Sequence, residues 1–94
     1  MDEIEKINER AQEQAELCKA FGYPRRILIL WALAQGDLAV SEIAKAIGAT
    51  VQNTSHHLRI MKGIGILQAK REGKHIRYSI ADKDRCKSLL NKAP

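Results

Sequence analysis

Hydrophobic positions recur at helical spacing over residues 40–47 and again over residues 51–62. The positions that share one helix face are Val40, Ile43, Ala44 and Ile47 in the first segment and Val51, Thr54, Leu58 and Met61 in the second. Between the segments, Gly48 lies where a helix C-terminus needs a left-handed residue, and Thr50 can cap the next helix. The pattern predicts a helix, a tight turn and a second helix across residues 40–62.

After residue 62 the pattern changes to that of a β-hairpin. Residues 66–71 and 75–80 read as strands, and Glu72-Gly73-Lys74 between them supplies a turn. A helix-turn-helix followed by such a hairpin is the arrangement of a winged helix-turn-helix. We therefore predict a mainly α fold with a small β-hairpin wing over residues 66–80.

Three further helices complete the expected single domain of residues 1–94. The first covers residues 2–21, and Gly22-Tyr23-Pro24 ends it, with Pro24 suited to the first turn of the next helix. Residues 25–35 are apolar all round, which marks a central core helix and makes Trp31 a packing residue. Asp82 is placed to cap a last helix over residues 83–91. The expected fold therefore has about five helices.

The first helix carries an apolar stripe that suggests pairing with a second subunit. Its members recur at spacings of three and four: Ile4, Ile7, Ala11, Gln14, Cys18 and Phe21. Helices that pair at shallow angles show this spacing, although a helix facing its own core shows it too. We expect residues 1–21 to form a dimerisation helix and the protein to be a homodimer.

Charge is divided unevenly along the chain. Residues 1–20 hold six acidic and three basic residues, whereas residues 45–77 hold seven basic residues and one acidic residue. The basic part coincides with the predicted helix-turn-helix and wing, where a duplex would need its phosphates neutralised. A solvated basic surface would look similar, but the coincidence with the motif favours double-stranded DNA as the partner.

The residue types on these elements suit contacts with a DNA operator. Amides and a guanidinium on the second helix can read base edges, and hydroxyls near its start suit phosphates. The expected DNA-binding residues are Thr50, Gln52, Asn53, Ser55, His56 and Arg59 on the helix and Lys70, Arg71, Lys74, His75 and Arg77 on the wing. Bidentate contact with adenine is expected of Gln52 and Asn53. His57 is turned about 100° from His56 on the helix, so we expect a structural role for it. Sequence alone leaves the register of the wing open.

Residues 18–80 resemble the ArsR/SmtB family of winged-helix repressors. The resemblance is carried by Lys19–Leu30, by Thr50–Leu58 and by Lys70–Lys74 followed by Tyr78-Ser79-Ile80. It implies five helices, a two-stranded wing, and dimerisation through the first and last helices. The implied dimer interface is Ile4, Ile7, Ala11, Cys18, Phe21, Cys86, Leu89 and Leu90.

The chain departs from this family at both of its metal sites. Ala39 takes the position of a cysteine thiolate, and the last helix lacks the histidines that would complete a site with Asp82 and Asp84. We therefore expect no metal and no cofactor, with Asp82 and Asp84 serving the helix terminus. Cys18 and Cys86 could form a redox pair if the first and last helices meet, although buried cysteine is more often a small hydrophobe. The small effector is unknown.

Other classes of function are less well supported. No nucleophile–base arrangement suggests an enzyme. A winged-helix module for protein interaction, or an architectural protein that binds DNA without sequence preference, remain alternatives. We expect no membrane span, since no segment approaches the roughly 20 apolar residues that one needs. We expect no signal peptide and a cytoplasmic location, because the N-terminus is acidic and two cysteines are too few for a disulfide framework.

Overall fold

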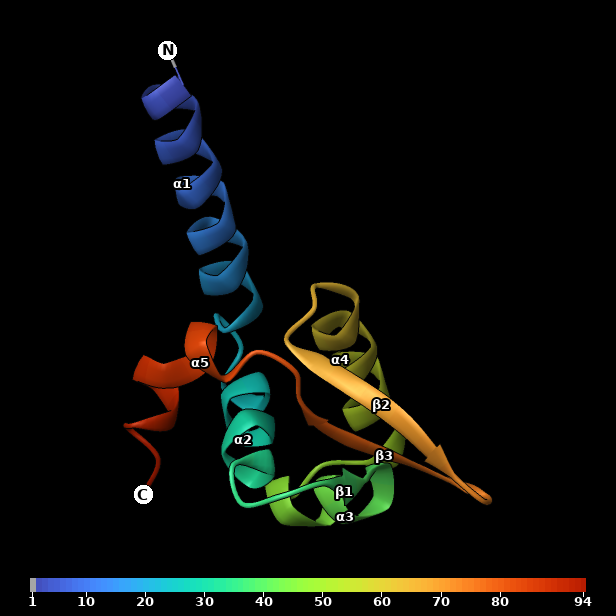
Figure 1. Ribbon diagram of the computed structural model, residues 1–94. Coiled ribbons are helices and arrows are strands. Elements are labelled where there is room, and N and C mark those ends of the chain that lie inside the picture. Colours follow the sequence, from blue (N-terminus) through green and yellow to red (C-terminus); the bar gives the residue numbers. More distant parts are fainter. Residues whose placement is uncertain (1) are drawn as a thin grey trace.

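The computed structural model describes residues 2–94 and shows five helices and three short strands in this range (Figure 1). The helices are α1 (Asp2–Ala20), α2 (Pro24–Leu33), α3 (Val40–Ile47), α4 (Val51–Gly63) and α5 (Lys83–Leu90). The strands are β1 (Leu38–Ala39), β2 (Leu67–Glu72) and β3 (His75–Ile80). The predicted fold class, mainly α with a small wing, is confirmed.

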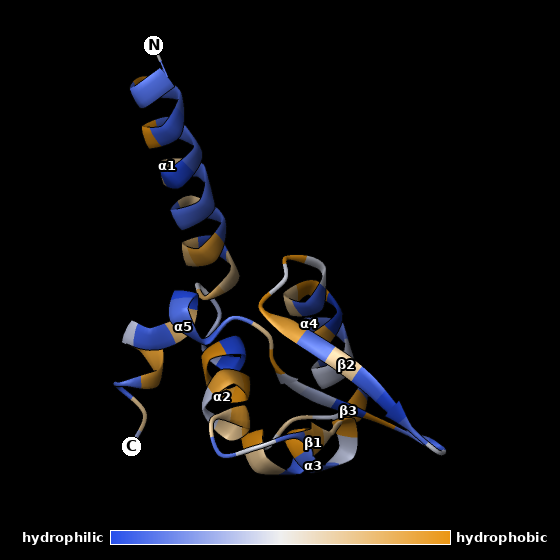
Figure 2. Cartoon of the chain, in the orientation of Figure 1, coloured by the Kyte–Doolittle hydropathy of each residue, from blue (hydrophilic) through white to orange (hydrophobic). Residues whose placement is uncertain are grey.

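The core forms where α2, α3 and α4 pack together beneath the base of the wing. Ile29 and Leu30 of α2 have no exposed surface, and Ile43 of α3 and Leu58 of α4 are equally enclosed. The core residues are Ala20, Phe21, Ile29, Leu30, Leu33, Ile43, Leu58, Met61, Ile66, Leu67, Ile80 and Cys86. Colouring by hydropathy shows apolar residues along α2, on parts of α3 and at the base of β2, whereas α4 carries both apolar and polar residues (Figure 2). The central position predicted for α2 is therefore correct.

The turn between α3 and α4 follows the signals in the sequence. Gly48 is the C-cap of α3 in a left-handed conformation, with φ at 69°. The Thr50 hydroxyl oxygen accepts a hydrogen bond from the Asn53 backbone N–H at 3.0 Å. Because a β-carbon disfavours the left-handed conformation and a free N–H needs an acceptor, both residue types stabilise this turn. The predicted cap and turn are confirmed.

The sheet has a third strand that the sequence did not reveal. β1 pairs antiparallel with β3 through Leu38 and Tyr78 and through Ala39 and Arg77, giving the strand order β1-β3-β2. A two-residue strand is too short to show an alternating pattern, so only its pairing identifies it. β1 fixes the start of α3 against the wing.

Helix α1 extends away from the rest of the chain (Figure 1). Ala20 is its buried residue, and the side chains of Ile4 and Ile7 are each 65% exposed. By contrast, α5 is anchored to α2, because Trp31 Nε1 donates a hydrogen bond to the Leu89 carbonyl oxygen at 2.9 Å. Trp31 is thus a packing residue, as predicted. No helix within residues 2–94 is both long enough and apolar enough to cross a membrane.

Two residues of the expected dimer interface lie instead in the core of the single chain. Phe21 is buried, and Cys86 has no exposed surface. Phe21 follows the end of α1, where the chain turns back toward α2, and Cys86 occupies the inner side of α5. Neither side chain is therefore presented to a second subunit in this conformation.

Candidate nucleic-acid interface

Helix α4 presents a polar face opposite the face that it buries. Thr54, Leu58 and Met61 have no exposed surface. On the other side Gln52, His56 and Arg59 are exposed, and Asn53 and Ser55 are half-buried. Burial of one side against α2 and α3 leaves the other side free to enter a groove of a duplex.

Val51 departs from the expected arrangement. It was predicted to share the buried stripe, but its side chain is 48% exposed. Val51 is the first residue of α4, and the helix begins beyond the edge of the core. The Val51 side chain therefore has no core residue to pack against. An apolar side chain therefore stands beside Gln52 on the exposed start of the helix.

His57 faces inward and is held by a buried arginine. Arg26 Nε donates a hydrogen bond to His57 Nδ1 at 3.0 Å, and Arg26 Nη1 donates to the Ala20 carbonyl oxygen at 3.3 Å. The guanidinium carbon of Arg26 lies 4.3 Å from the centre of the Tyr23 ring, and the arginine is only 7% exposed. Burial, followed by the positive charge of Arg26, lowers the pKa of His57. Since Nδ1 accepts, the neutral ring carries its proton on Nε2.

This cluster confirms the structural role predicted for His57 and adds two residues that the sequence analysis missed. Arg26 links the end of α1 to α4, and Tyr23 covers the guanidinium. The available signal was a pair of arginines, Arg25 and Arg26, at the start of the otherwise mainly apolar stretch of residues 25–35. A charge rarely occupies a core helix unless it has partners, so its position called for an acceptor elsewhere in the chain.

A second arginine reaches the polar face of α4 from α2. Arg25 Nη1 donates a hydrogen bond to Asn53 Oδ1 at 2.6 Å, between residues 28 apart in the sequence. Arg25 was not among the expected DNA-binding residues. Its side chain is exposed and contacts the polar face of α4 through Asn53.

Pairing of the two strands fixes the register of the wing. Lys70 pairs with Arg77, and Glu72 with His75, whereas Arg71 pairs with Ile76 on the opposite face. Paired residues share a face because successive side chains alternate. Lys70, Arg71, Lys74 and His75 are all exposed. Lys74 lies in the turn beside Gly73, whose φ is 61°.

Arg77 is the exception among the basic residues of the wing. Its Nη2 donates a hydrogen bond to the Asp37 carbonyl oxygen at 2.8 Å. Its guanidinium also lies 3.7 Å from a Glu42 carboxylate oxygen and 3.9 Å from one of Glu72. These contacts hold Arg77 at the base of the wing, where β1 meets β3. A contact between Arg77 and DNA stays a prediction, and it would compete with the Asp37 carbonyl group and the two carboxylates that surround this guanidinium.

Asp82 caps α5, as predicted. Its carboxylate accepts hydrogen bonds from the Arg85 backbone N–H at 3.1 Å and from Arg85 Nε at 2.8 Å. The backbone hydrogen bond is the main reason that the pKa of Asp82 is lowered. Within residues 2–94 no three histidine, cysteine, aspartate or glutamate side chains gather in a group that could hold a metal ion.

The two cysteines have different surroundings. Both are free thiols; Cys18 is exposed on α1 and Cys86 is buried. Burial raises the pKa of Cys86, so this thiol is less readily ionised than an ordinary one.

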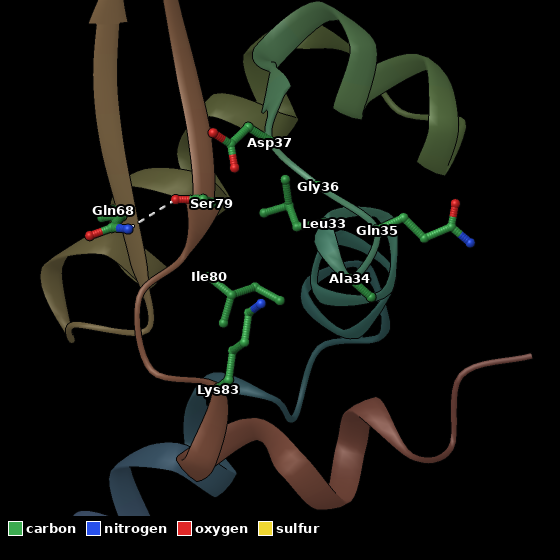
Figure 3. A pocket seen from close by; sticks show the side chains of 9 residues that line it. All are labelled: Leu33, Ala34, Gln35, Gly36, Asp37, Gln68, Ser79, Ile80 and Lys83. Atoms are coloured by element: carbon green, nitrogen blue, oxygen red, sulfur yellow. Dashed lines mark hydrogen bonds between the residues drawn. The ribbon is translucent and has the colours of Figure 1, made fainter.

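A cavity of about 300 Å³ lies away from the polar face of α4, between the end of α2, the base of the wing and the start of α5 (Figure 3). Asp37 and Lys83 are the charged residues of its lining. The Gln68 amide donates a hydrogen bond to the Ser79 hydroxyl at 3.1 Å, and the Gln35 side chain points away from the cavity. One acid and one base give no ligand set for a metal ion.

The chain matches known regulatory proteins in sequence. The family model described as "Bacterial regulatory protein, arsR family" matches residues 23–69. The HTH-type transcriptional regulator MJ1325 of Methanocaldococcus jannaschii is 40% identical over 83 residues, which cover 87% of this chain and 92% of that relative. The homologue of the cadmium resistance regulator CadC from Staphylococcus aureus is 36% identical over 80 residues, covering 84% of this chain and 65% of its own length.

Solved structures share the fold. The homodimeric winged helix-turn-helix DNA-binding domain of Mb0332 from Mycobacterium bovis is 34% identical, with a TM-score of 0.81 over 92% of this chain and 80% of that one. The transcriptional repressor BigR from Xylella fastidiosa is 26% identical, with a TM-score of 0.82 over 93% of this chain and 89% of that one. The matched residues include α2, α3, α4 and the first residues of the wing. The chain is therefore a winged helix-turn-helix transcriptional regulator that belongs to the arsR family.

Proposed function

We propose that this protein is a transcriptional repressor that binds a pseudo-palindromic operator as a homodimer. The observation that carries the proposal is α4, whose inner face is buried while Gln52, His56 and Arg59 stand exposed beside a basic wing. Side chains of this kind on the second helix of such a motif read base edges in the major groove. The proposal includes no catalytic role, and it places the protein with the DNA in the cytoplasm.

Each exposed group of α4 suits a particular contact. Arg59 can donate two hydrogen bonds to guanine, and Gln52 can pair with adenine. Val51 offers an apolar surface to the methyl group of thymine, as small apolar side chains do in the major groove. The Thr50 oxygen caps the helix, but its hydroxyl proton is still free to donate to a phosphate.

The wing supplies charge at some distance from α4. Lys70, Arg71, Lys74 and His75 are exposed along the hairpin, which projects from the body of the chain (Figure 1). Lysine and arginine contacts with phosphates strengthen binding to every sequence and make it sensitive to salt. In this proposal α4 provides the specificity and the wing provides much of the affinity.

Dimerisation is proposed for the stripe on α1 and for the outer residues of α5. Ile4, Ile7, Ala11 and Cys18 are exposed along α1, and Leu89 and Leu90 are half-buried on α5. An unpartnered row of isoleucines at this spacing is suited to a second helix. The Mycobacterium bovis domain with the same fold is described as homodimeric, which supports the same assembly here. Two copies of α4 would then engage two half-sites.

In this proposal the repressor is not released from DNA by oxidation of Cys18 and Cys86 to a disulfide. Cys86 has no exposed surface, and its raised pKa makes attack on another sulfur unfavourable. Ala39, at the start of α3, carries no metal-binding group, and the Asp82 carboxylate is engaged with Arg85. Micromolar zinc should therefore leave the complex with DNA intact.

A footprint on the DNA upstream of the coding sequence tests the proposal. The expected result is protection of two inverted half-sites about one helical turn apart, on the same face of the duplex. Equal affinity for operator and random duplex, with steep salt dependence, would instead indicate an architectural protein. Failure to bind any duplex would leave the winged-helix interaction module as the better explanation.

A further inference from the structure

Arg25 lies outside the helix-turn-helix segment, yet its side chain contacts the polar face of α4. It is the second residue of α2, and Asn53 is the third residue of α4. The 2.6 Å hydrogen bond from Arg25 Nη1 to Asn53 Oδ1 joins the first turns of the two helices. Both side chains retain contact with solvent on the side that the proposed function assigns to DNA.

The hydrogen bond fixes which group Asn53 can offer to a base. An asparagine amide that reads adenine accepts from the N6 amino group with its oxygen and donates to N7 with its nitrogen. Here one of the two lone pairs of the oxygen already accepts from a guanidinium, whose positive charge disfavours a second donor at the other. Asn53 Nδ2 has no hydrogen-bond partner among residues 2–94 and is not enclosed. The group that faces outward is therefore a donor.

The remaining donors of Arg25 extend this surface. A guanidinium carries five N–H groups, and the structure engages one of them with Asn53. Arg25 and Asn53 together thus present several free N–H donors and only one remaining acceptor lone pair, which lies next to the positive charge of Arg25. Among the four bases, guanine exposes two acceptors, O6 and N7, in the major groove, whereas adenine exposes one acceptor and one donor.

We infer that Arg25 is a positioning residue that sets base preference through Asn53, making this end of α4 select guanine and reject adenine. The inference rests on the proposed function, because it assumes that α4 enters the major groove. It replaces the contact with adenine that the sequence alone suggested for Asn53. It also places one determinant of specificity in α2, outside the segment that touches bases in a simple helix-turn-helix.

A competing role for Arg25 is a plain phosphate contact. That role would strengthen binding to all sequences alike and would contribute to the salt dependence. A positioning role predicts a change in preference at one base pair of each half-site. The two roles can therefore be separated by measuring preference in addition to affinity.

The experiment uses the full chain and a set of operator duplexes in which each position of the half-site carries each of the four bases. The wild type should prefer guanine over adenine by roughly tenfold at one position. Arg25→Met keeps the apolar stem and removes the donor, so this preference should fall and adenine should gain. Arg71→Met, on the wing, is the matched control and should weaken all duplexes equally.

A double-mutant cycle shows whether Arg25 acts through Asn53. In the Asn53→Ala protein the preference at this position should already be lost, and adding Arg25→Met should change it no further. Asn53→Asp keeps the contact with Arg25 but turns an acceptor outward, so preference should move to cytosine or adenine, which expose an amino donor. Both side chains are solvent-accessible, and thermal unfolding of each variant should match the wild type.

The possible failures are distinguishable. Arg25→Met could lower affinity for every duplex equally and reduce the slope of log affinity against log salt concentration. In that case Arg25 is a phosphate contact and the inference is overturned. If it changes neither affinity nor preference, the hydrogen bond has no role in recognition and the inference is again overturned. If the wild type itself shows no base preference at any position, the proposed function fails first.

Discussion

Helices α1 and α4 each carry a row of apolar side chains, but only one of the rows is covered. In α4, Thr54, Leu58 and Met61 have no exposed surface, whereas Ile4 and Ile7 of α1 are 65% exposed. The two patterns look alike in the sequence because both follow helical spacing. The difference shows that spacing predicts a face that needs covering, while the source of the cover depends on tertiary contacts. The predictions below test this contrast.

Substituting both Ile4 and Ile7 with aspartate should have the largest effect. If the exposed stripe of α1 pairs with a second subunit, two carboxylates in it would oppose association. A monomer would engage one half-site, so operator affinity should fall by about 100-fold or more. Sedimentation measures the assembly and a gel shift measures the affinity. Glu9→Ala, on the opposite side of α1, should change neither, and a stable dimer in the double variant would refute this interface.

The covered stripe of α4 should determine the stability of the single chain. Leu58→Ala should lower the free energy of unfolding by about 2–5 kcal/mol, because it leaves a cavity in a fully buried site. Val51→Ala on the same helix should change it by roughly 0.5 kcal/mol or less, since that side chain is half exposed. Urea unfolding of both variants provides the comparison. Equal losses would contradict the assignment of Val51 to the surface.

The two DNA-binding elements should differ in the kind of affinity they contribute. Arg59→Ala should cost about 1–3 kcal/mol on the operator and flatten the preference at one position of each half-site. Lys74→Ala should weaken binding to operator and random duplex alike and reduce the salt slope by about one. Titrations at several salt concentrations separate the two effects. If neither substitution changes affinity, α4 and the wing do not dock as proposed.

Substitution of Thr54 should raise the free energy of unfolding, and by less than Leu58→Ala lowers it. Its hydroxyl is buried and has no hydrogen-bond partner within residues 2–94. Thr54→Val keeps the shape and removes the unsatisfied oxygen, so the free energy of unfolding should rise by about 1 kcal/mol. Chemical denaturation measures the change, and Ser55→Ala on the more exposed neighbouring position is a control. A loss of stability would mean that the hydroxyl has a partner such as buried water.

The smallest effect concerns the pH dependence of stability through His57. Burial and the charge of Arg26 lower its pKa below the ordinary value of 6.5, so the unfolded chain takes up a proton at higher pH than the folded chain. The contribution of His57 is complete above pH 6.5 and is lost as the pH falls from there toward the folded pKa. Unfolding measured at about pH 7.5 and 5.5 should therefore differ less in His57→Gln than in the wild type. The exposed His75→Gln should retain the full difference.

The sequence by itself determined the local elements of this protein. Gly48 and Thr50 fix the turn between α3 and α4 through backbone conformation and a capping hydrogen bond, both of which act within a few residues. The polar side of α4, the basic wing, and the cap of α5 by Asp82 were predictable for the same reason. Periodicity also indicated the core-facing sides of α3 and α4, because a buried helix face requires apolar residues at intervals of three and four.

Tertiary structure decided the features that join distant residues. Arg25 meets Asn53 across 28 positions and Arg26 meets His57 across 31, and neither pair has a local signature. The hydrogen bond from Arg77 to the Asp37 carbonyl oxygen spans 40 positions and holds this arginine at the base of the wing. The third strand and the exposure of Val51 likewise depend on which element lies alongside. Hydrogen bonds of this kind form only after the helices pack, so the base preference proposed for α4 is a property of the folded arrangement of α2 and α4.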